Sequence, residues 1–424
     1  KTAFDQVGIL GDQAGDYEND LDNNPGQEFV LVTGTNNTGL FVYDTNGNNL
    51  GQISATEVLS KPSVTDNGSE IIFVGTDKKI HYIFIDWNQT NITPQEQILG
   101  SSPVWRSAII SKDGLKIAAV TQDKVNEIQV FYFGGPSVTQ NTFELYNPTY
   151  SQGVTTGDVL YADAMEFDIT GENIMYDAEN EISSSTAGSI SYWDISFIKV
   201  WNNETNTFSL GKVSKLFSSL PEKVSVGNPV FSKNSPYIIA FDYLDESEFI
   251  SIVGANIESG TASAIYNKNN TLGYPNFSSK DNKLIFDNEN VTNNTFNLGI
   301  VNLKTSKIEA ASNPALFISG RRWGVWFSNG QRVLSGTTEP GANTSETFSI
   351  RQNPVSETLV VDILKNLTHG ASLSITDPAG KEIYRTGAIH AGVNVIDTVS
   401  LRPGLYFVTL RTAATPKTLT FVKQ

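Results

Sequence analysis

The chain has 424 residues, of which 39% are hydrophobic and 17% charged, and its formal net charge is −16. This composition predicts a folded chain, and no apolar run approaches the roughly 18 residues that a membrane-spanning helix needs. The absence of Cys excludes disulfides, thiol nucleophiles and Cys-ligated metal centres, and the excess of carboxylates disfavours nucleic acid as a partner.

The charge is unevenly distributed along the chain. Residues 347–424 contain eight Lys or Arg and five Asp or Glu and so carry +3, whereas the preceding 346 residues carry −19. This difference predicts two regions with different surfaces. The sequence starts at Lys1 without a Met or a charged-then-apolar leader, so we expect either a mature chain that has lost its signal or a trimmed one.

An internal repeat organises the sequence before about Gly336. In each unit an apolar anchor is followed seven positions later by a second apolar residue, and a polar turn lies between them. The anchors are Val64, Ile110, Phe167, Phe231 and Phe277, and their partners are Ile71, Ile117, Ile174, Ile238 and Leu284. Because the Asp, Asn and Gly of these turns tolerate the positive φ of a tight hairpin, each turn is predicted to join two strands.

Successive anchors are 46, 57, 64 and 46 residues apart, close to the roughly 40 to 50 residues of a four-stranded propeller blade. We expect the extra residues of the two long units to form loops. Residues 28–34 and 40–44 repeat the second and third strands of a unit, and 323–330 repeat the first, so the last strand is predicted to complete the first blade. We predict six blades closed in this way, or seven if residues before Asp22 supply an inner strand.

The repeated motif resembles a known family of short propeller repeats. An apolar residue and Ser precede a polar turn in Phe231-Ser232, Phe277-Ser278 and Ile110-Ser111-Lys112-Asp113-Gly114. Over roughly residues 16–335 this pattern resembles the TolB-like and WD40-like β-propellers. The resemblance implies a toroid with a central channel but no particular reaction. We therefore expect an all-β chain with a propeller at 1–335 and, because residues 336–346 are small and polar with Pro and Gly, an exposed linker there.

Residues 347–424 are predicted to form a second domain. Short alternating runs at 359–363, 371–375, 382–384, 393–396, 405–410 and 419–422 are separated by turns with Pro and Gly. Six or seven strands in fewer than 80 residues are typical of a small immunoglobulin-like β-sandwich.

This tail resembles the type A C-terminal sorting domain of type IX secretion system substrates in Bacteroidetes. The residues that carry the resemblance are Asn353, Pro354, Asp377, Gly380, Asn394, Gly404, Tyr406 and Lys423. The resemblance implies that the type IX secretion machinery recognises residues 347–424 and that the chain is secreted or anchored at the outer-membrane cell surface. As a purely structural alternative, the glycines would be ordinary turn residues and Tyr406 a core residue.

In a propeller, the residues just before each inner strand surround the mouth of the channel. Here they are Lys61, Arg106, Asp163, Asn228, Tyr274 and Arg322. With Trp105 and Trp323 nearby, this set could bind a polar or sugar-like ligand, such as a glycan or part of a protein, by stacking and by bidentate hydrogen bonds. The favoured alternative is that these groups pair with one another and hold the ring closed, because polar residues in a channel usually satisfy each other.

Two acidic runs could chelate Ca²⁺. One contains Asp16, Glu18, Asp20 and Asp22, and the other Asp242, Asp245, Glu246 and Glu248. Neither run has the spacing of a Ca²⁺-binding loop, so solvated loops are the favoured interpretation. Residues 16–47 also resemble the opening blade of calcium-dependent propeller phytases, over that one blade.

The sequence predicts no catalytic residue, no metal ligand set and no cofactor other than Ca²⁺. It contains three His, namely His81, His369 and His390, and lacks the Gly-x-Ser-x-Gly elbow of many hydrolases. His81 is expected to be a surface or interface residue, and Trp87, Trp193 and Trp201 to pack between blades. A non-enzymatic binding or scaffold protein is therefore favoured. The alternative is a Ca²⁺-dependent hydrolase or lyase acting on a glycan or phosphoester.

Overall fold

The structure is a computed structural model. It describes residues 21–423 except 24–25, 88–93, 149–153, 185–187, 218–219, 222, 291, 293, 331, 335–347, 351–354, 364–370, 378–380, 388, 391, 403 and 412–416. The chain divides into two compact units, Lys1–Thr337 and Thr338–Gln424. The linker predicted at 336–346 lies outside the described residues.

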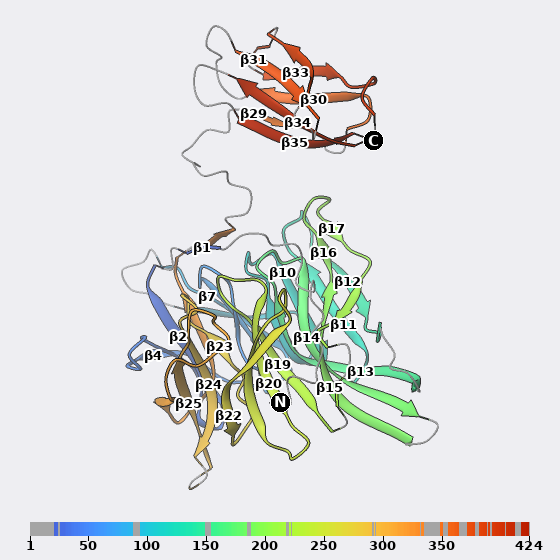
Figure 1. Cartoon of the computed structure of the whole chain (residues 1–424). Coiled ribbons are helices and arrows are strands. Elements are labelled where there is room, and N and C mark those ends of the chain that lie inside the picture. The colour runs from blue at the N-terminus through green and yellow to red at the C-terminus, as the bar shows by residue number, and fades with distance from the viewer. Residues whose placement is uncertain are drawn as a thin grey trace. The chain divides into compact units, whose positions relative to one another are not determined.

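The described residues of the first unit form six four-stranded antiparallel sheets, numbered here in chain order (Figure 1). Sheet 1 contains β27 (Arg321–Ser328), β2 (Glu28–Gly34), β3 (Thr38–Tyr43) and β4 (Asn49–Glu57). Sheet 2 contains β5 (Ser63–Val64), β6 (Glu70–Val74), β7 (Ile80–Phe84) and β8 (Gln95–Leu99). Sheet 3 contains β9 (Trp105–Ile110), β10 (Lys116–Thr121), β11 (Glu127–Tyr132) and β12 (Thr139–Glu144).

The other three sheets repeat this pattern. Sheet 4 contains β13 (Val154–Phe167), β14 (Asn173–Ser184), β15 (Gly188–Lys199) and β18 (Val213–Lys215). Sheet 5 contains β19 (Ser225–Phe231), β20 (Ile238–Leu244), β21 (Ile250–Asn256) and β22 (Thr261–Asn269). Sheet 6 contains β23 (Asn276–Phe277), β24 (Lys283–Asn290), β25 (Thr295–Asn302) and β26 (Ala315–Ser319).

The first strands of the six sheets surround a common centre. β5, β9, β13, β19, β23 and β27 each contact the next, and β27 contacts β5, so the ring is closed. Closure is made as the sequence predicts, because β27 pairs with β2 and places Phe327 opposite Phe29. The unit is a β-propeller, and the all-β prediction is confirmed. The seven-bladed alternative placed an inner strand before Asp22, and residues 1–20 lie outside the described part of the chain.

The predicted hairpins have the expected register in sheets 2, 3, 4 and 6, as Val64 opposite Ile71 in sheet 2 illustrates. In sheet 5, Phe231 lies opposite Ile239 rather than the predicted Ile238, because seven residues connect the two instead of six. Gly68, in the turn of sheet 2, has φ of 67°, which glycine adopts without steric cost.

Neighbouring sheets bury their faces against each other. Between sheets 2 and 3, for example, Ile72 and Val74 pack in one cluster with Ala108 and Ile117. Removing such apolar surface from water stabilises the fold by about 25 cal/mol per Å². Large aromatic rings add to two of these contacts, since Trp87 stacks on Phe29 of sheet 1 at 4.8 Å and Trp201 lies 4.4 Å from Tyr132 of sheet 3. Trp193 instead packs within sheet 4, on Tyr161.

Where the structure describes the two long units, many of the extra residues form strands instead of the predicted loops. These residues lengthen β13, β14 and β15 and add a two-stranded sheet of β16 (Trp201–Asn202) and β17 (Thr207–Phe208). Paired backbone groups in these added strands satisfy hydrogen bonds that a loop would leave to water. A further small sheet pairs β1 (Leu21–Asn23) with β28 (Arg332–Leu334).

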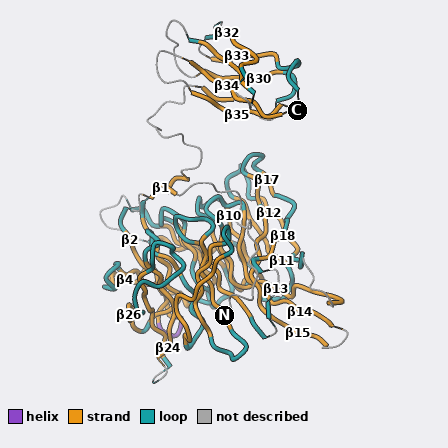
Figure 2. The backbone as a smooth tube through the Cα atoms, in the orientation of Figure 1, coloured by secondary structure: helices purple, strands orange, loops and turns teal. Residues whose placement is uncertain are grey.

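Strands and loops account for almost all of the described residues (Figure 2), which include one 3₁₀ turn, η2 (Thr35–Asn37). Among the described residues no helix is long and apolar enough to cross a membrane.

The second unit consists of two sheets. One contains β29 (Phe348–Ile350), β30 (Thr358–Ile363) and β33 (Gly392–Asp397), and the other β32 (Glu382–Thr386), β31 (Ser372–Thr376), β34 (Gly404–Arg411) and β35 (Lys417–Lys423). Leu359 and Ile396 of the first sheet share a buried cluster with Leu373, Val408 and Phe421 of the second. The unit is therefore a two-sheet β structure with its own core, and its immunoglobulin-like topology stays a prediction.

Candidate functional site

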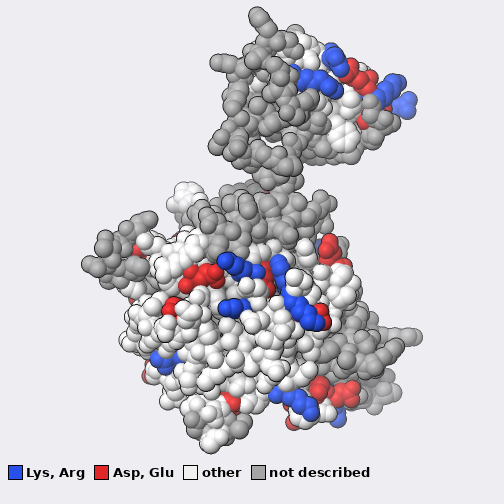
Figure 3. Space-filling model, turned by 60° about the vertical axis from the view of Figure 1, so that its left-hand side comes forward, with Lys and Arg blue, Asp and Glu red and all other residues white. Residues whose placement is uncertain are grey.

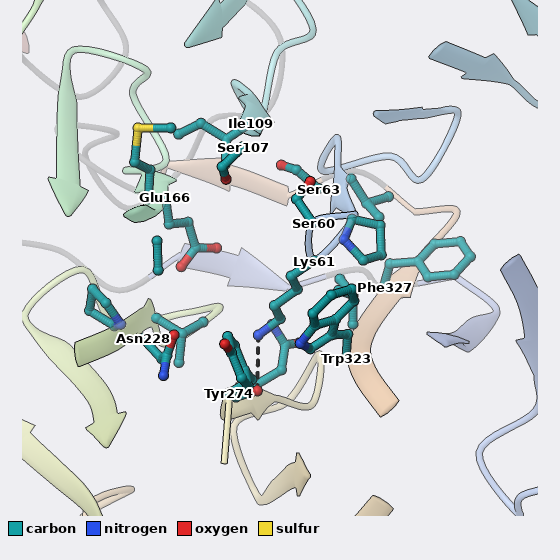
Figure 4. A pocket seen from close by; sticks show the side chains of 18 of the residues that line it. Ser60, Lys61, Ser63, Ser107, Ile109, Glu166, Asn228, Tyr274, Trp323 and Phe327 are labelled. Atoms are coloured by element: carbon teal, nitrogen blue, oxygen red, sulfur yellow. Dashed lines mark hydrogen bonds between the residues drawn. The ribbon is translucent and has the colours of Figure 1, made fainter. Parts of the chain in front are cut away.

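A cavity of about 390 Å³ lies at the centre of the propeller (Figure 4). The first strand of each sheet, or the residues next to it, contributes to the lining, as Ser63, Ser107, Glu166, Val230 and Val325 illustrate. A cavity of this size can enclose a small ligand. The channel predicted from the repeat is thus the natural candidate site.

The structure brings five of the six predicted mouth residues to this cavity. The lining includes Lys61, Arg106, Asp163, Asn228 and Tyr274. The sixth, Arg322, lies outside the lining. Its guanidinium lies over the Trp323 ring at 4.0 Å and its Nε is 3.8 Å from Asp287 Oδ2. Of the two tryptophans, Trp323 lines the cavity, whereas Trp105 packs edge-on against Phe131.

Several of the mouth residues bond to one another or to groups behind the channel. Arg106 Nε lies 3.1 Å from Asp163 Oδ1, and a second guanidinium nitrogen donates to the Ala162 carbonyl. Asn228 donates through its side chain to Asp242 Oδ2 at 2.8 Å. The Arg106–Asp163 pair joins sheets 3 and 4 and so corresponds to the alternative in which the mouth residues hold the ring together.

Three buried aspartates behind the channel escaped the sequence analysis as a set. Asp177, Asp242 and Asp287 occupy the same place in sheets 4, 5 and 6, three residues after the residue that faces the anchor. Their exposed fractions are 3%, 2% and 0%. Sheets 1, 2 and 3 have Val at this place, namely Val32, Val74 and Val120.

Each of these carboxylates accepts a hydrogen bond from a backbone N–H in the first strand of the next sheet, or two residues before that strand. Asp177 accepts the Asn228 N–H at 2.7 Å, Asp242 the Tyr274 N–H at 3.2 Å, and Asp287 the Trp323 N–H at 2.7 Å. All three donors have positive φ, at 51°, 44° and 54°. Since non-glycine residues rarely adopt this conformation, the carboxylates stabilise a costly backbone geometry at the channel wall.

Burial dominates the acid–base behaviour of the three aspartates. It raises the pKa of Asp177 to about 7, that of Asp242 to about 6 and that of Asp287 to about 8, although the hydrogen bonds to each carboxylate oppose the change. The aromatic-Asp pairs Tyr176-Asp177, Phe241-Asp242 and Phe286-Asp287 are the sequence signal that could have identified the set.

Three lysines and one glutamate form a second group that the sequence analysis missed, apart from Lys61. Lys112 and Lys233 lie in the turns that follow β9 and β19, at the end of the channel opposite the mouth. Lys112 Nζ is 2.7 Å from Glu166 Oε1, and Glu166 Oε2 accepts the Phe231 N–H at 2.7 Å. Lys61 reaches across the channel and donates to the Tyr274 carbonyl at 2.9 Å (Figure 4).

The charges in this group influence one another. Burial lowers the pKa of Lys61 to about 8 and that of Lys233 to about 8 as well. The charge of Glu166 opposes both changes, and the charge of Lys112 adds to them. Burial alone would raise the pKa of Glu166, but the charges of Lys112 and Lys233 outweigh it and hold that pKa below its ordinary value. Lys112 and Lys233 both stand two places after an anchor, and this recurrence was the available signal.

The acidic runs do not form the expected solvated loops throughout. Asp242 is a buried strand residue, whereas Asp245 lies in the following turn and accepts the N–H groups of Ser247 and Phe249. Glu246 and Glu248 are exposed in that turn. In the first run, Asp16, Glu18 and Asp20 lie outside the described residues, and Asp22 lies in β1. Across the described residues, no three His, Cys, Asp or Glu side chains are grouped so as to hold a metal ion.

His81, which was expected to be a surface or interface residue, is buried. It is 6% exposed and lies between two carboxylates, with Nδ1 2.9 Å from Glu96 and Nε2 3.0 Å from Asp77. It also stacks on Phe73. These contacts fix the ring within sheet 2, away from the channel lining.

Five of the sorting-motif residues belong to the described part of the second unit. Tyr406 donates to the Arg402 carbonyl at 2.9 Å and stacks on Phe421, and the Asn394 side chain bonds the backbone of His390. Asp377 accepts the Lys381 N–H, Gly404 has φ of 155°, and Lys423 is 8% exposed in β35. Asn353, Pro354 and Gly380 lie outside the described residues.

Residues 352–424 match the family described as "Secretion system C-terminal sorting domain". This tail is a sorting domain. The predicted resemblance is thereby confirmed, and the chain is an export substrate of the type IX kind found in Bacteroidetes, secreted or attached at the cell surface. No curated protein matches the chain.

Several solved propeller structures are similar to the chain. TolB from Acinetobacter baumannii is 14% identical with a TM-score of 0.48, over 74% of this chain and 67% of that one. A putative TolB from Agrobacterium tumefaciens is 10% identical with a TM-score of 0.42, over 70% and 91%. A putative 6-phosphogluconolactonase from Bacteroides fragilis is 10% identical with a TM-score of 0.39, over 74% and 99%.

Proposed function

We propose that the chain is an exported binding protein whose propeller channel holds a small polar ligand, while the type IX machinery recognises its sorting domain. The observation that carries the proposal is the polar cavity onto which all six sheets converge. In such a cavity, a ligand can contact groups from every sheet at once, including the aromatic rings of Tyr274 and Trp323.

The charges of the lining favour this role over the Ca²⁺-dependent enzyme. The cations Lys61, Arg106, Lys112 and Lys233 line the cavity together with the carboxylates Asp66, Asp163 and Glu166. Two of those carboxylates are already bound by cations, Asp163 by Arg106 and Glu166 by Lys112. Because Ca²⁺ requires six to eight oxygen ligands, several of them usually carboxylates, this lining suits a polar or anionic ligand better than a divalent cation.

Ligand binding can be tested by blocking the channel in the full chain. Ser107 lines the cavity, so Ser107→Trp places a large ring in it, whereas Ser259→Trp adds the same ring at an exposed outer turn. In calorimetric titrations with a panel of neutral and charged sugars, we expect at least one ligand to bind the native chain and Ser259→Trp but not Ser107→Trp. Two results would contradict the proposal: a ligand affinity that is unchanged in Ser107→Trp, or Ca²⁺-dependent turnover of a glycan or phosphoester.

Export can be tested in the native host by deleting residues 347–424. Since the sorting domain lies within this segment, the deletion is expected to reduce the extracellular and surface-bound protein to background. Ligand binding by the retained protein in cell extracts controls for folding of the propeller. Export at the level of the full chain would refute the role of the tail.

A further inference from the structure

We propose that the channel binds its ligand through an oxyanion group, a carboxylate or a phosphate, held by Lys233 with Lys61 and Lys112 as neighbouring cations. This inference rests on the proposed function, because it names the ligand class of the same channel. Its basis is the arrangement of positive and negative groups along the lining.

The ammonium group of Lys233 is the central observation. Its side chain lines the cavity, and no acceptor in the described part of the chain hydrogen-bonds its Nζ. The turn that carries it is fixed, since Asp281 accepts the N–H groups of Lys233 and Asn234 at 2.6 and 2.9 Å. An ammonium group that is largely removed from water and has no acceptor costs free energy, and a bound anion would recover it.

The nearby carboxylates are engaged with other groups. Glu166 uses one oxygen for Lys112 and the other for the Phe231 N–H. Asp281 is 3.2 Å from Lys307 Nζ and accepts two backbone N–H groups in addition. These contacts leave Lys233 without a hydrogen-bonded counter-ion among the described residues.

Lys61 adds a second cation whose charge is not neutralised by a contact. Its Nζ donates to the carbonyls of Tyr274 and Pro275, at 2.9 and 3.1 Å, which are neutral acceptors. The lining carries four cations and three carboxylates. The cations are Lys61, Arg106, Lys112 and Lys233, and the carboxylates are Asp66, Asp163 and Glu166. In the whole chain, by contrast, carboxylates outnumber cations, and the net charge is −16.

The acid–base behaviour of the lysines supports this assignment. Burial lowers the pKa of both Lys61 and Lys233 to about 8, although nearby carboxylates such as Glu166 oppose the change, and repulsion from Lys112 adds to it. An anion placed among them would stabilise their charged forms. The cavity of about 390 Å³ leaves room beside the anionic group for a body of the size of one sugar ring, close to Tyr274 and Trp323.

The test uses three sugars that share one scaffold: glucuronate carries a carboxylate, glucose 6-phosphate a phosphate, and glucose no charge. Calorimetric titration of the full chain at pH 7 and low ionic strength should show binding of at least one anionic sugar, with glucose weaker by roughly tenfold or more. The sugar that binds identifies the source of the oxyanion. Binding of neither anionic sugar would overturn the proposal.

The matched variants are Lys233→Met and Lys280→Met. Both remove one lysine charge from the turn after a first strand, but Lys280 is exposed in the turn of sheet 6. Affinity for the anionic sugar should fall roughly tenfold in Lys233→Met and stay unchanged in Lys280→Met. Melting temperatures control for folding, and Lys233→Met should be at least as stable as the native chain because a buried charge without a partner is removed.

The outcomes separate this inference from the proposed function. Glucose binding as tight as that of the anionic sugars, blocked by Ser107→Trp but unaffected by Lys233→Met, would overturn the oxyanion assignment and leave channel binding intact. Anion binding that persists in Ser107→Trp would place the ligand outside the channel and overturn both.

Discussion

At the scale of single residues, the three buried aspartates give the propeller an unusual dependence on pH. The ordinary pKa of an aspartate is 3.8, and burial raises the pKa of Asp177, Asp242 and Asp287 to about 7, 6 and 8. The folded state therefore binds protons more tightly than the unfolded state at these sites. Their contribution to stability is complete below the ordinary pKa and is lost as the pH rises through the raised values.

We expect the melting temperature of the full chain to fall between pH 5.5 and pH 8. In this window the carboxylates whose pKa lies below the ordinary value, such as Glu166, are already ionised in the folded and the unfolded state. Lys61 and Lys233, whose pKa is lowered to about 8, change their contribution to stability mainly above pH 8. Asp287→Asn keeps an acceptor for the Trp323 N–H but has no charge, so calorimetric melting should show a weaker fall.

The control is Asp123→Asn, which changes an exposed aspartate in the same way and should leave the pH dependence as it is. A melting temperature that is constant or rises over this window, or an unchanged slope in Asp287→Asn, would show that these carboxyl groups are ionised in the folded state across the whole range.

At the scale of strands and sheets, the sequence predicts the elements that depend on local pattern. Val64 and Ile71 reveal their hairpin because the apolar pair and the turn between them lie within eight residues, and the same holds for Phe277 and Leu284. The lengthened β13 to β15 were missed, because residues 154–158 lack apolar alternation and become part of a strand by pairing with residues 181–184 of β14.

The candidate site was predictable to the extent that it follows the repeat. Lys61 and Tyr274 were placed at the channel because each stands three positions before an anchor. The partners were not predictable in this way, since Asp177 of sheet 4 accepts from Asn228, a residue of β19 in the next sheet that has positive φ. Such contacts depend on how neighbouring sheets are placed, which no spacing within one unit encodes.

At the scale of the whole propeller, an acidic protein encloses a channel whose lining has more cations than carboxylates. On the face shown in Figure 3, Lys and Arg lie beside Asp and Glu rather than in separate fields. The 346 residues before the second domain carry a net charge of −19, so the outer surface repels anions at long range, although salt limits this repulsion to a Debye length of about 8 Å. We infer that selection for an anionic group would take place inside the channel, at short range.

The ring is held closed by the pairing of β27 with β2, which joins residues about 300 positions apart. The Trp326 N–H bonds Asn276, so alternation along the strand directs the Val325 N–H towards β2, where Val325 faces Leu31. Val325→Pro removes that donor from the ladder and leaves its acceptor unpaired, which should cost about 1–3 kcal/mol. Hydrogen exchange measured by mass spectrometry should become roughly tenfold faster, or more, in β2 and β3.

The same experiment examines how far the effect extends. The buried cluster of the second unit contains residues of that unit alone, among them Leu359 and Val408, so exchange in β30 and β34 should not change. Val138→Pro places the same residue in an exposed loop and should leave exchange in β2 unaffected. Unaltered protection of β2 in Val325→Pro would mean that packing between the faces of neighbouring sheets, rather than the β27–β2 ladder, keeps the ring closed.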